Sequence, residues 1–430
     1  MGDLMRFEDV LDRSKILDPW IEFVGRGPKC LRLAFNWDNG PVYDFVLPET
    51  LCQDIKHLVL VRSPPILDIV PEGSSLPRLE TLVIFHGQVV GVPSNDRKHD
   101  FPPHSTDQIC KLWLHGLDPI SFLSQRQSWT QLTHLVLEER VASVSPIFHS
   151  CPQLEEAVIF LKYDPSEFTL GSNSNPSTPA HPHRALAKLV IYTFFNSWPV
   201  LPTIADYFLE WHLPALVSFQ LTTSMQTQDV FRGWSGLMER MPLLQEVYLG
   251  PGLHYSRVNE EELYDAFNKF NPFLHTLILD QSEDMMSTLE PSAAPYYRYP
   301  FSSVEALHRF ISNRTRKTHR TTDGVLHEAI KKLVILLSDA EEVSDLSRSL
   351  LQNVKTNLDP FLSLADHEDG GGHNGAGGGL KFEGSLASTP YRTLISNSPH
   401  SWYYGTSEQK ERHLEQLMND YSMYHAFSVG

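Results

Sequence analysis

The chain has 430 residues and a formal net charge of −17 at pH 7. A negative field of this size repels nucleic acid and anionic membrane surfaces, so we expect neither as a partner. Hydrophobic residues make up 41% of the chain, but the longest apolar runs fall far short of the roughly 20 residues that span a bilayer. The first residues are mixed and acidic, not basic and then apolar. We therefore expect an intracellular protein, cytoplasmic or nuclear.

A short phrase recurs along the chain: an apolar residue, two residues, an apolar residue, one residue and a third apolar residue. It reads Ile55-Lys56-His57-Leu58-Val59-Leu60 in an early copy and runs from Leu274 to Leu279 in a late one. The form L-x-x-L-x-L is the strand segment of a leucine-rich repeat, and self-similarity at such a period is typical of a solenoid. The middle apolar residues of the copies are Leu31, Leu58, Leu82, Leu112, Leu135, Ala157, Leu189, Phe219, Val247, Leu277 and Leu333.

The spacing of the copies sets the fold class that we predict. Most intervals run from 22 to 32 residues and the last is 56 residues, so we expect one degraded copy between Asp280 and Ile330. We predict an α/β fold: a leucine-rich-repeat-like solenoid with irregular repeats, parallel strands on the concave face, and helices and loops on the convex face.

Composition shifts along the chain set the predicted domain boundaries. Residues 366–390 hold two glycine triplets, and an aromatic segment with helical periodicity lies beyond them. The predicted parts are an N-terminal helical cap at 1–28, a solenoid of about 11–12 repeats at 29–340, a helical cap at 341–365, a disordered Gly-rich loop at 366–390 and a C-terminal tail helix at 391–430.

Two connectors between copies carry helix-start signals. Ser145-Pro146 supplies an N-cap residue followed by proline at the first helical position. Asn259 and Glu262 have the spacing of a capping box, and an apolar stripe that ends at Phe270 follows them. We expect each connector to pack a helix on the back of the strands.

No catalytic, cofactor-binding or metal-binding pattern is found in the sequence. There is no G-x-S-x-G elbow and no phosphate-binding loop. The closest histidine pairs, His99 with His104 and His181 with His183, lie in Pro-rich loops without zinc-ligand spacing, so we expect exposed histidines there. We predict no enzyme activity, no cofactor and no metal.

Cysteines and a basic cluster have ordinary structural interpretations. The cysteines are Cys30, Cys52, Cys110 and Cys151, and their wide spacing predicts buried, reduced thiols. The basic cluster consists of Arg314, Arg316, Lys317, His319 and Arg320. It follows an apparent helix at 304–311, and we interpret it as a solvated helix end. A contact with phosphate or an acidic partner is the alternative.

A strand alternates its side chains between two faces, so the residues between the apolar pairs predict a concave surface. An apolar floor with polar flanks is typical of a protein-binding groove. The alternative is that the chain's own loops or tail cover this floor. Trp113, Phe160, Tyr192 and Tyr248 are the expected anchors. The predicted protein-binding residues are Arg32, His57, Val59, Phe85, Trp113, His115, Glu138, Phe160, Tyr192, Gln220, Tyr248 and Asp280.

Parts of the sequence resemble a known family. The stretch from Leu17-Asp18-Pro19-Trp20 to Cys30-Leu31-Arg32-Leu33, and phrases such as Leu76-Pro77-Arg78-Leu79 and Cys151-Pro152-Gln153-Leu154, are similar to F-box/leucine-rich-repeat-like proteins of mushroom-forming fungi. The likeness covers roughly 12–337. It implies that the repeats recruit a protein substrate for a ubiquitin ligase. No F-box is visible before Asp12, so we expect either a truncated chain or a binding module without the segment that couples it to a ligase.

Two classes of function therefore stay open. The first is a non-enzymatic recognition protein that binds another protein on its concave face. The second is a hydrolase or transferase with a site built from loops, for which the sequence offers no residue set.

Overall fold

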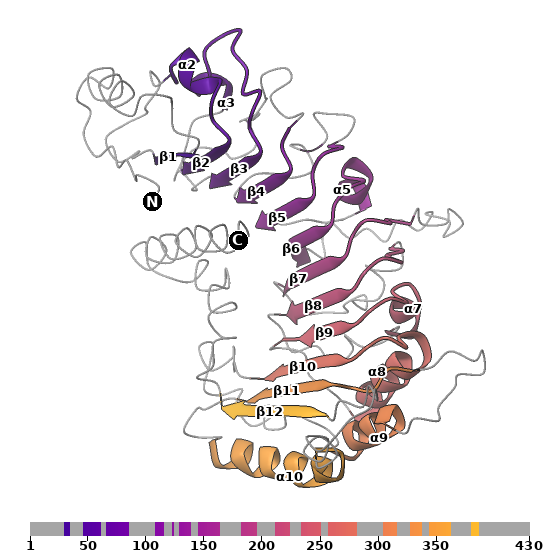
Figure 1. The fold of residues 1–430 in the computed structure, drawn as a ribbon. Helices are drawn as coiled ribbons and strands as arrows, with labels where there is room; N and C mark the ends of the chain where they lie inside the picture. Colours follow the sequence, from indigo (N-terminus) through magenta and orange to yellow (C-terminus); the bar gives the residue numbers. More distant parts are fainter. Residues whose placement is uncertain are drawn as a thin grey trace, which may run out of the picture. The chain divides into compact units, whose positions relative to one another are not determined.

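The computed structural model describes residues 30–34, 46–61, 66–85, 108–115, 123, 129–138, 145–163, 182–195, 211–223, 234–250, 257–281, 304–315, 327–337, 344–362 and 380–386. The fold is α/β, as predicted. Its strands form one parallel, open sheet in which strand order follows chain order, drawn in Figure 1. The chain divides into two compact units, residues 1–277 with 301–330 and residues 278–300 with 331–430.

Each copy of the apolar phrase forms a strand that begins one residue before its middle apolar residue. The strands are β1 Cys30–Ala34, β2 His57–Val61, β3 Thr81–Phe85, β4 Lys111–His115, β5 His134–Glu138, β6 Glu156–Tyr163, β7 Lys188–Phe195, β8 Ser218–Thr223, β9 Glu246–Leu249, β10 Thr276–Gln281, β11 Lys332–Leu337 and β12 Lys381–Leu386. The last of these has no copy of the phrase in the sequence.

Three apolar positions per copy build the core of unit 1. In β2 they are Ile55, Leu58 and Leu60, and all three side chains are fully buried. The corresponding residues of β3 to β9 are also buried. Because the phrase repeats in register, these side chains stack from strand to strand into one continuous core, and each strand gains most of its stability from its neighbours.

A ladder of backbone hydrogen bonds links the strand starts of unit 1. The carbonyl oxygen of Lys56 accepts from the N–H groups of Glu80 and Thr81 at 2.8 and 3.0 Å. The same two-to-one arrangement recurs at each strand that follows. The accepting carbonyls belong to Lys56, Glu80, Cys110, Thr133, Glu155, Ala187, Val217 and Gln245. This ladder fixes the register at the point where the chain enters each strand.

A tight turn precedes most of these strands. In one turn, the N–H of Leu79 donates to the carbonyl of Leu76 at 3.2 Å. The second residue of this turn is often proline, whose fixed φ suits that position of a turn. We call the first residue of this turn the turn position. Its members are Leu76, Trp129, Cys151, His183, Leu213, Met241 and Asn271, and all are buried. Two of them, His183 and Asn271, are polar.

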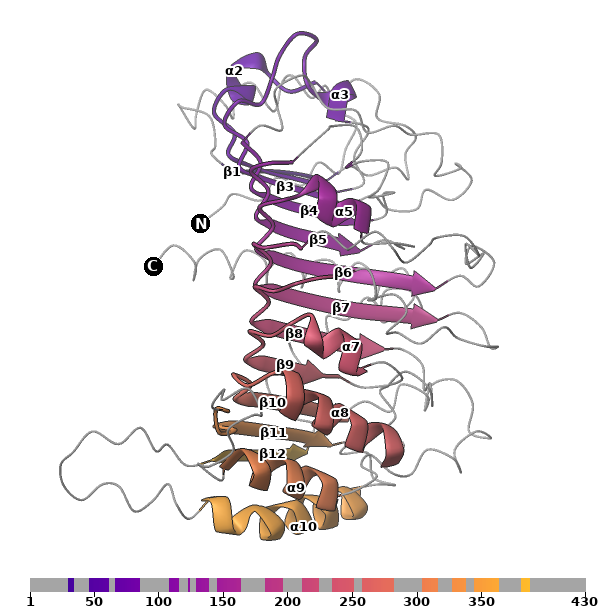
Figure 2. The same ribbon diagram turned by 90° about the vertical axis from the view of Figure 1, so that its right-hand side faces the viewer.

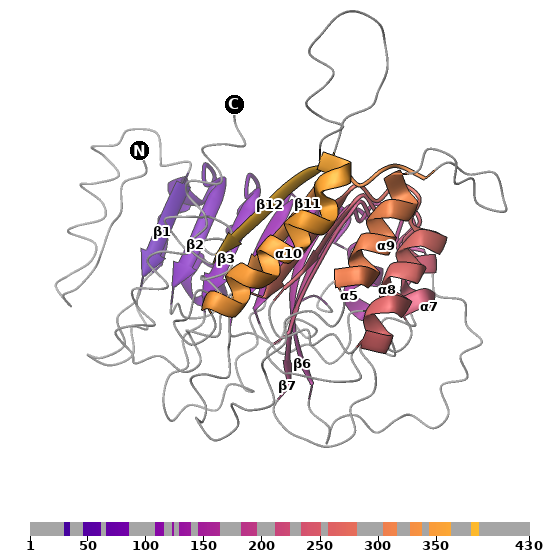
Figure 3. The same ribbon diagram turned by 90° about the horizontal axis from the view of Figure 1, so that it is seen from below.

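The helices of unit 1 are α2 Glu49–Cys52, α3 Ile66–Ile69, α5 Ser145–Ser150, α7 Trp234–Glu239, α8 Arg257–Phe270 and α9 Val304–Thr315. Figures 2 and 3 show α5, α7, α8 and α9 on one side of the strands. Helix α8 packs against both α7 and α9, with Tyr264 stacked on Phe310 at a centroid distance of 5.0 Å. The interior side chains of strands β2 to β9 are buried.

Unit 2 pairs β11 with β12 and packs helix α10, Ser344–Leu362, on β12. The side chains from Leu333 to Leu337 are all buried. Helix α10 buries Val354 and Leu358, one turn apart, and exposes most of its other described residues. This is the pattern of an amphipathic helix that covers one layer.

Two sequence predictions need correction. The loop predicted at 366–390 contains strand β12, in which Phe382 and Gly384 stand in register with Leu333 and Ile335. Gly384 stands where the other copies have an apolar residue, so this strand does not carry the apolar phrase. Helix α8 begins at Arg257 or earlier, so Asn259 is not its N-cap. By contrast, α5 (Ser145–Ser150) lies at the Ser145-Pro146 helix-start signal, and α10 lies within the helical cap at 341–365.

Other predictions fall on residues outside the described ranges. These are the caps at 1–28 and 391–430, most of the 366–390 loop and the histidine pair His99 and His104. The degraded copy expected between Asp280 and Ile330 lies partly outside them, and residues 304–315 of that interval form α9.

Candidate protein-binding face

The strand registers align the predicted surface residues into columns. Arg32 pairs with Val59 across β1 and β2, and the same register continues to Tyr248 in β9. We call this line the central column, made of Arg32, Val59, Val83, Trp113, Val136, Val158, Val190, Gln220 and Tyr248. The flanking column beside it, two residues earlier in each strand, is Cys30, His57, Thr81, Lys111, His134, Glu156, Lys188, Ser218 and Glu246. Together they form the column face of unit 1. The alignment predicted from the phrase is confirmed.

The central column is only partly open to solvent. Trp113 and Tyr248, expected as exposed anchors, are 7% and 6% exposed, so neither offers a free aromatic surface. Val83 and Val190 are also buried, whereas Val59, Val136, Val158 and Gln220 are partly exposed. The open part of the central column is therefore aliphatic and polar, and two of its four residues lie on the neighbouring strands β5 and β6.

The remaining predicted residues are less accessible or less defined. Asp280 in β10 is 1% exposed, so its side chain is buried and was wrongly expected on the surface. For Arg32, Phe85, His115, Glu138, Phe160 and Tyr192, the structure describes the strand but not the side chain.

Charged side chains of the flanking column interact between neighbouring strands. The Nζ atom of Lys188 in β7 donates to Oε1 of Glu156 in β6 at 2.6 Å. The other carboxylate oxygen of Glu156 lies 3.9 Å from Nε2 of His134 in β5. The three side chains remain between 33% and 40% exposed. They form a polar strip beside Val136 and Val158.

Hydrogen bonds fix the ring state of His134. The Thr133 hydroxyl donates to the carbonyl of Cys110 at 3.1 Å, because a carbonyl can only accept. Thr133 Oγ1 therefore accepts from Nδ1–H of His134 at 2.8 Å, which leaves Nε2 unprotonated in the neutral ring. Thr133, His134 and Glu156 together are not a catalytic triad, because the hydroxyl proton is committed to a carbonyl and the histidine does not activate it.

Burial lowers the pKa of both His57 and His134 below the ordinary histidine value. The charge of Lys111 adds to the lowering at both rings, while Glu80 and Glu156 oppose it at His57 and His134 respectively. Both rings are thus favoured as neutral at physiological pH. In this part of the flanking column, Lys111 and Lys188 carry the positive charge.

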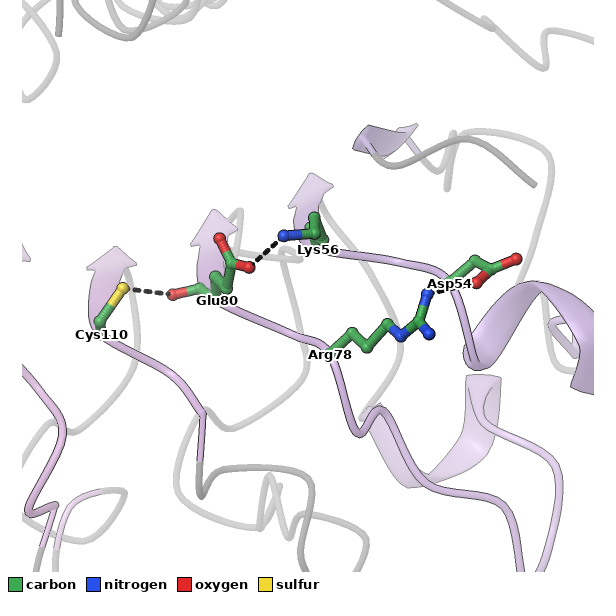
Figure 4. Close-up of polar contacts among 5 residues, drawn as sticks. All are labelled: Asp54, Lys56, Arg78, Glu80 and Cys110. Atoms are coloured by element: carbon green, nitrogen blue, oxygen red, sulfur yellow. Dashed lines mark hydrogen bonds and ion pairs between the residues drawn. The ribbon is translucent and has the colours of Figure 1, made fainter. Parts of the chain in front are cut away.

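A second set of ion pairs joins the residues just before β2 and β3. Lys56 pairs with Glu80, and Nη1 of Arg78 lies 3.0 Å from Oδ1 of Asp54. Figure 4 shows both pairs, with the thiol of Cys110 directed at the carbonyl of Glu80 at 3.3 Å. These side chains are 36% to 65% exposed. Pairs at this exposure contribute about 0–1 kcal/mol each.

The cysteines agree only in part with the prediction of buried thiols. Cys52 and Cys151 are fully buried, and burial raises their pKa to about 11 and about 12 respectively. Cys110 is partly exposed, and burial also raises its pKa. Cys30, at the start of β1, is exposed. All four are free thiols.

His183 was expected to be exposed but is 7% exposed at the turn position. Its Nε2–H donates to the carbonyl of Cys151 at 2.9 Å, and its Nδ1 accepts from the N–H of Leu186 at 3.2 Å. Phe148 packs on the ring at a centroid distance of 5.4 Å. Burial lowers the pKa of His183. The ring is thus a neutral structural link between two turns.

Arg314 was expected on a solvated helix end, but it is 3% exposed. Its guanidinium donates to Asn268 Oδ1 at 2.9 Å and to the carbonyls of Phe267, Asn271 and Pro272 at the end of α8. Burial lowers its pKa to about 10. A planar cation with several donors suits the carbonyl-rich end of a helix, so Arg314 fastens α9 to α8.

Asn271 is the second polar residue at the turn position. Its Nδ2 donates to the carbonyls of Met238 and Met241, at 3.3 and 2.8 Å. The side chain thus satisfies backbone groups of the preceding copy. Sequence reasoning missed this role, although a polar residue where other copies have Leu or Met was a visible signal.

Within the described residues, no group of three or more His, Cys, Asp or Glu side chains could hold a metal ion. No helix of that part of the chain has the length and apolar character needed to cross a membrane. Comparison with protein-family models and with curated proteins gives no match to this chain.

Proposed function

We propose that this chain is a non-enzymatic protein-recognition module with leucine-rich repeats, and that its partner binds the column face of unit 1. The observation that carries this proposal is the strip formed by His134, Glu156 and Lys188 beside the partly exposed Val136 and Val158. It is a solvent-accessible aliphatic floor with a polar flank, held at fixed strand spacing. Mixed surfaces of this kind are typical of non-obligate protein interfaces.

The repeat type and the ligase link rest on separate support. The L-x-x-L-x-L phrase coincides with a strand in each of β2 to β10, which favours leucine-rich repeats. The link to a ubiquitin ligase rests on the resemblance of the turn-and-strand phrases to F-box/leucine-rich-repeat-like proteins. In this proposal the column face selects the protein to be modified, and the chain itself performs no chemistry.

Site-specific crosslinking tests the binding face. A photoreactive amino acid at Val158 should crosslink a discrete protein in a cell extract, while one at the exposed Glu239 on α7 should not. That protein, once purified, should bind the unmodified chain and bind Val158→Arg at least about tenfold more weakly, because the new charge is desolvated at the interface. Equal crosslinking at both positions, or unchanged affinity of Val158→Arg, would refute the proposal.

A further inference from the structure

The edge of unit 1 where the chain enters the strands changes its chemical character along the copies. The third residue of the turn before each strand shows the change. Its members, in chain order, are Arg78, Gln131, Gln153, Ala185, Ala215, Leu243 and Phe273. The first three are exposed and polar, the next two are partly exposed alanines, and the last two are exposed and apolar. Leu243 is 44% exposed and Phe273 is 37% exposed, although other large hydrophobic side chains at the turns are buried.

The apolar part of this edge is continuous. The carbonyl of Ala187 accepts from the N–H groups of Val217 and Ser218, and the carbonyl of Val217 accepts from those of Gln245 and Glu246. These bonds hold neighbouring copies about 4.8 Å apart, and Ala187 and Val217 are partly exposed. We call this row the edge strip, made of Ala185, Ala187, Ala215, Val217, Leu243 and Phe273. Single exposed hydrophobic residues are normal on a protein surface, whereas a contiguous row indicates an interaction site.

Leu243 lies between residues of opposite charge in its own copy. Arg240 comes just before the turn and is partly exposed, and Glu246 begins β9 and is exposed. Because the chain runs from the helices through the turn into the strand, Arg240 is on the helix side of the edge strip and Glu246 is on the column-face side. Lys188, the other charged residue of β7 to β10 on the column-face side, is already paired with Glu156. A surface with an apolar middle and opposite charges on its two sides is complementary to itself.

We propose that the edge strip is an interface with a second copy of this chain, related to the first by a two-fold axis that runs along the strip. Such an axis places Leu243 of one copy on the edge strip of the other at the same level. It also brings Arg240 of each copy to Glu246 of the other. Charge complementarity carries the choice of a second copy, because a partner with one sign of charge on both sides would meet a like charge on one of them.

This inference goes beyond the proposed function, because the edge strip and the column face are different surfaces. A dimer of this kind carries two column faces, so a partner with two binding segments would be held by both. The edge strip spans the copies of four strands, β7 to β10, and is therefore at the small end of specific interfaces. We expect a dissociation constant on the order of tens of micromolar.

Sedimentation velocity of the full chain, from about 2 to about 200 µM, tests the dimer. The natural chain should change from monomer to dimer across this range. Leu243→Glu places a charge in the middle of the interface and should raise the dissociation constant at least about tenfold. Gln153→Glu is the matched control, because Gln153 is the exposed third residue of the turn before β6, and it should dimerise like the natural chain.

Two results of this experiment would overturn the inference. One is a monomer at every concentration, which is also the result expected if the edge strip binds a different protein. The other is equal dimerisation of Leu243→Glu and the natural chain. The substituted side chain is exposed, so the variant should fold, and its urea midpoint should match that of the natural chain.

A charge exchange tests the two-fold arrangement. Arg240→Glu and Glu246→Arg should each weaken the dimer, because each creates two pairs of like charges across the interface. The double variant Arg240→Glu/Glu246→Arg should restore it, because both pairs form again with their signs exchanged. A double variant that dimerises no better than the two single variants would overturn the arrangement.

The dimer and the proposed function can fail separately. Val158→Arg, on the column face, should dimerise like the natural chain, and Leu243→Glu should still crosslink the protein partner through a photoreactive amino acid at Val158. If Val158→Arg abolishes the dimer while Leu243→Glu does not, self-association uses the column face and the inference is wrong.

Discussion

The turn position and the column face of unit 1 both place polar side chains on neighbouring copies of one phrase, yet the two regions use them differently. At the turn position, His183 and Asn271 are buried and bond backbone carbonyls of the preceding copy. On the column face, His134, Glu156 and Lys188 are about one-third or more exposed; Glu156 pairs with Lys188 and lies beside His134. Buried polar groups are costly to leave unpaired, whereas exposed ion pairs contribute little. The first region therefore stabilises the fold, and the second is available for recognition.

We expect the largest loss of stability when a buried polar side chain is replaced. Arg314→Met removes a buried cation that bonds three carbonyls and one side-chain amide. We expect a loss of about 2–3 kcal/mol in the free energy of unfolding, because the carbonyls lose charged donors in a buried site. Urea denaturation would measure it. Arg309→Met is the matched control, since Arg309 is 64% exposed and only 3.8 Å from Glu261; a similar loss in both variants would contradict the assigned role.

An intermediate effect, dependent on pH, is expected at His183. Its folded-state pKa is lowered by burial, so the unfolded chain binds the proton more readily. Its contribution to stability is therefore complete above the unfolded pKa of about 6.5 and falls as pH drops below that value. His183→Leu, which copies the residue present at Leu213, should lose about 1–2 kcal/mol at neutral pH, because the Cys151 carbonyl and the Leu186 amide lose their partner.

The same variant should also flatten the acid side of the stability profile. Urea midpoints of the natural chain and His183→Leu, compared at about pH 8 and about pH 5.5, give the measurement. The natural chain should lose more stability than the variant between these two conditions. Parallel losses would mean that other groups, such as His57 or His134, dominate the acid response.

The smallest effect is expected at the exposed ion pair before β2 and β3. Arg78→Ala removes a 65% exposed guanidinium from Asp54, and we expect a change of about 0.5 kcal/mol or less in unfolding free energy. In the same denaturation assay, the free energy of unfolding of this variant should agree with that of the natural chain within error. A loss comparable to that of Arg314→Met would show that exposure is the wrong criterion for separating the two regions.

The sequence predicted the positions of the strands better than it predicted which side chains are exposed. Each strand from β2 to β11 coincides with a copy of the phrase, because a run of alternating apolar residues specifies both the strand and the side that it buries. Strand β12 was not predicted, because Gly384 stands where the phrase has an apolar residue. Trp113 and Tyr248 were assigned to the correct column but are buried, since a two-residue period says which way a side chain leaves a strand and not what lies over it.

The sequence by itself determined the repeat period, the parallel strand order and the alignment of the central and flanking columns, since all three depend on spacing along one chain. Only the tertiary structure decided which polar residues are buried and which are accessible. The partners of Arg314 lie 42 to 47 residues away, and the carbonyl that fixes His183 lies 32 residues away. Burial and hydrogen bonding depend on contacts between segments that are distant in the sequence, and a local sequence pattern does not predict those contacts.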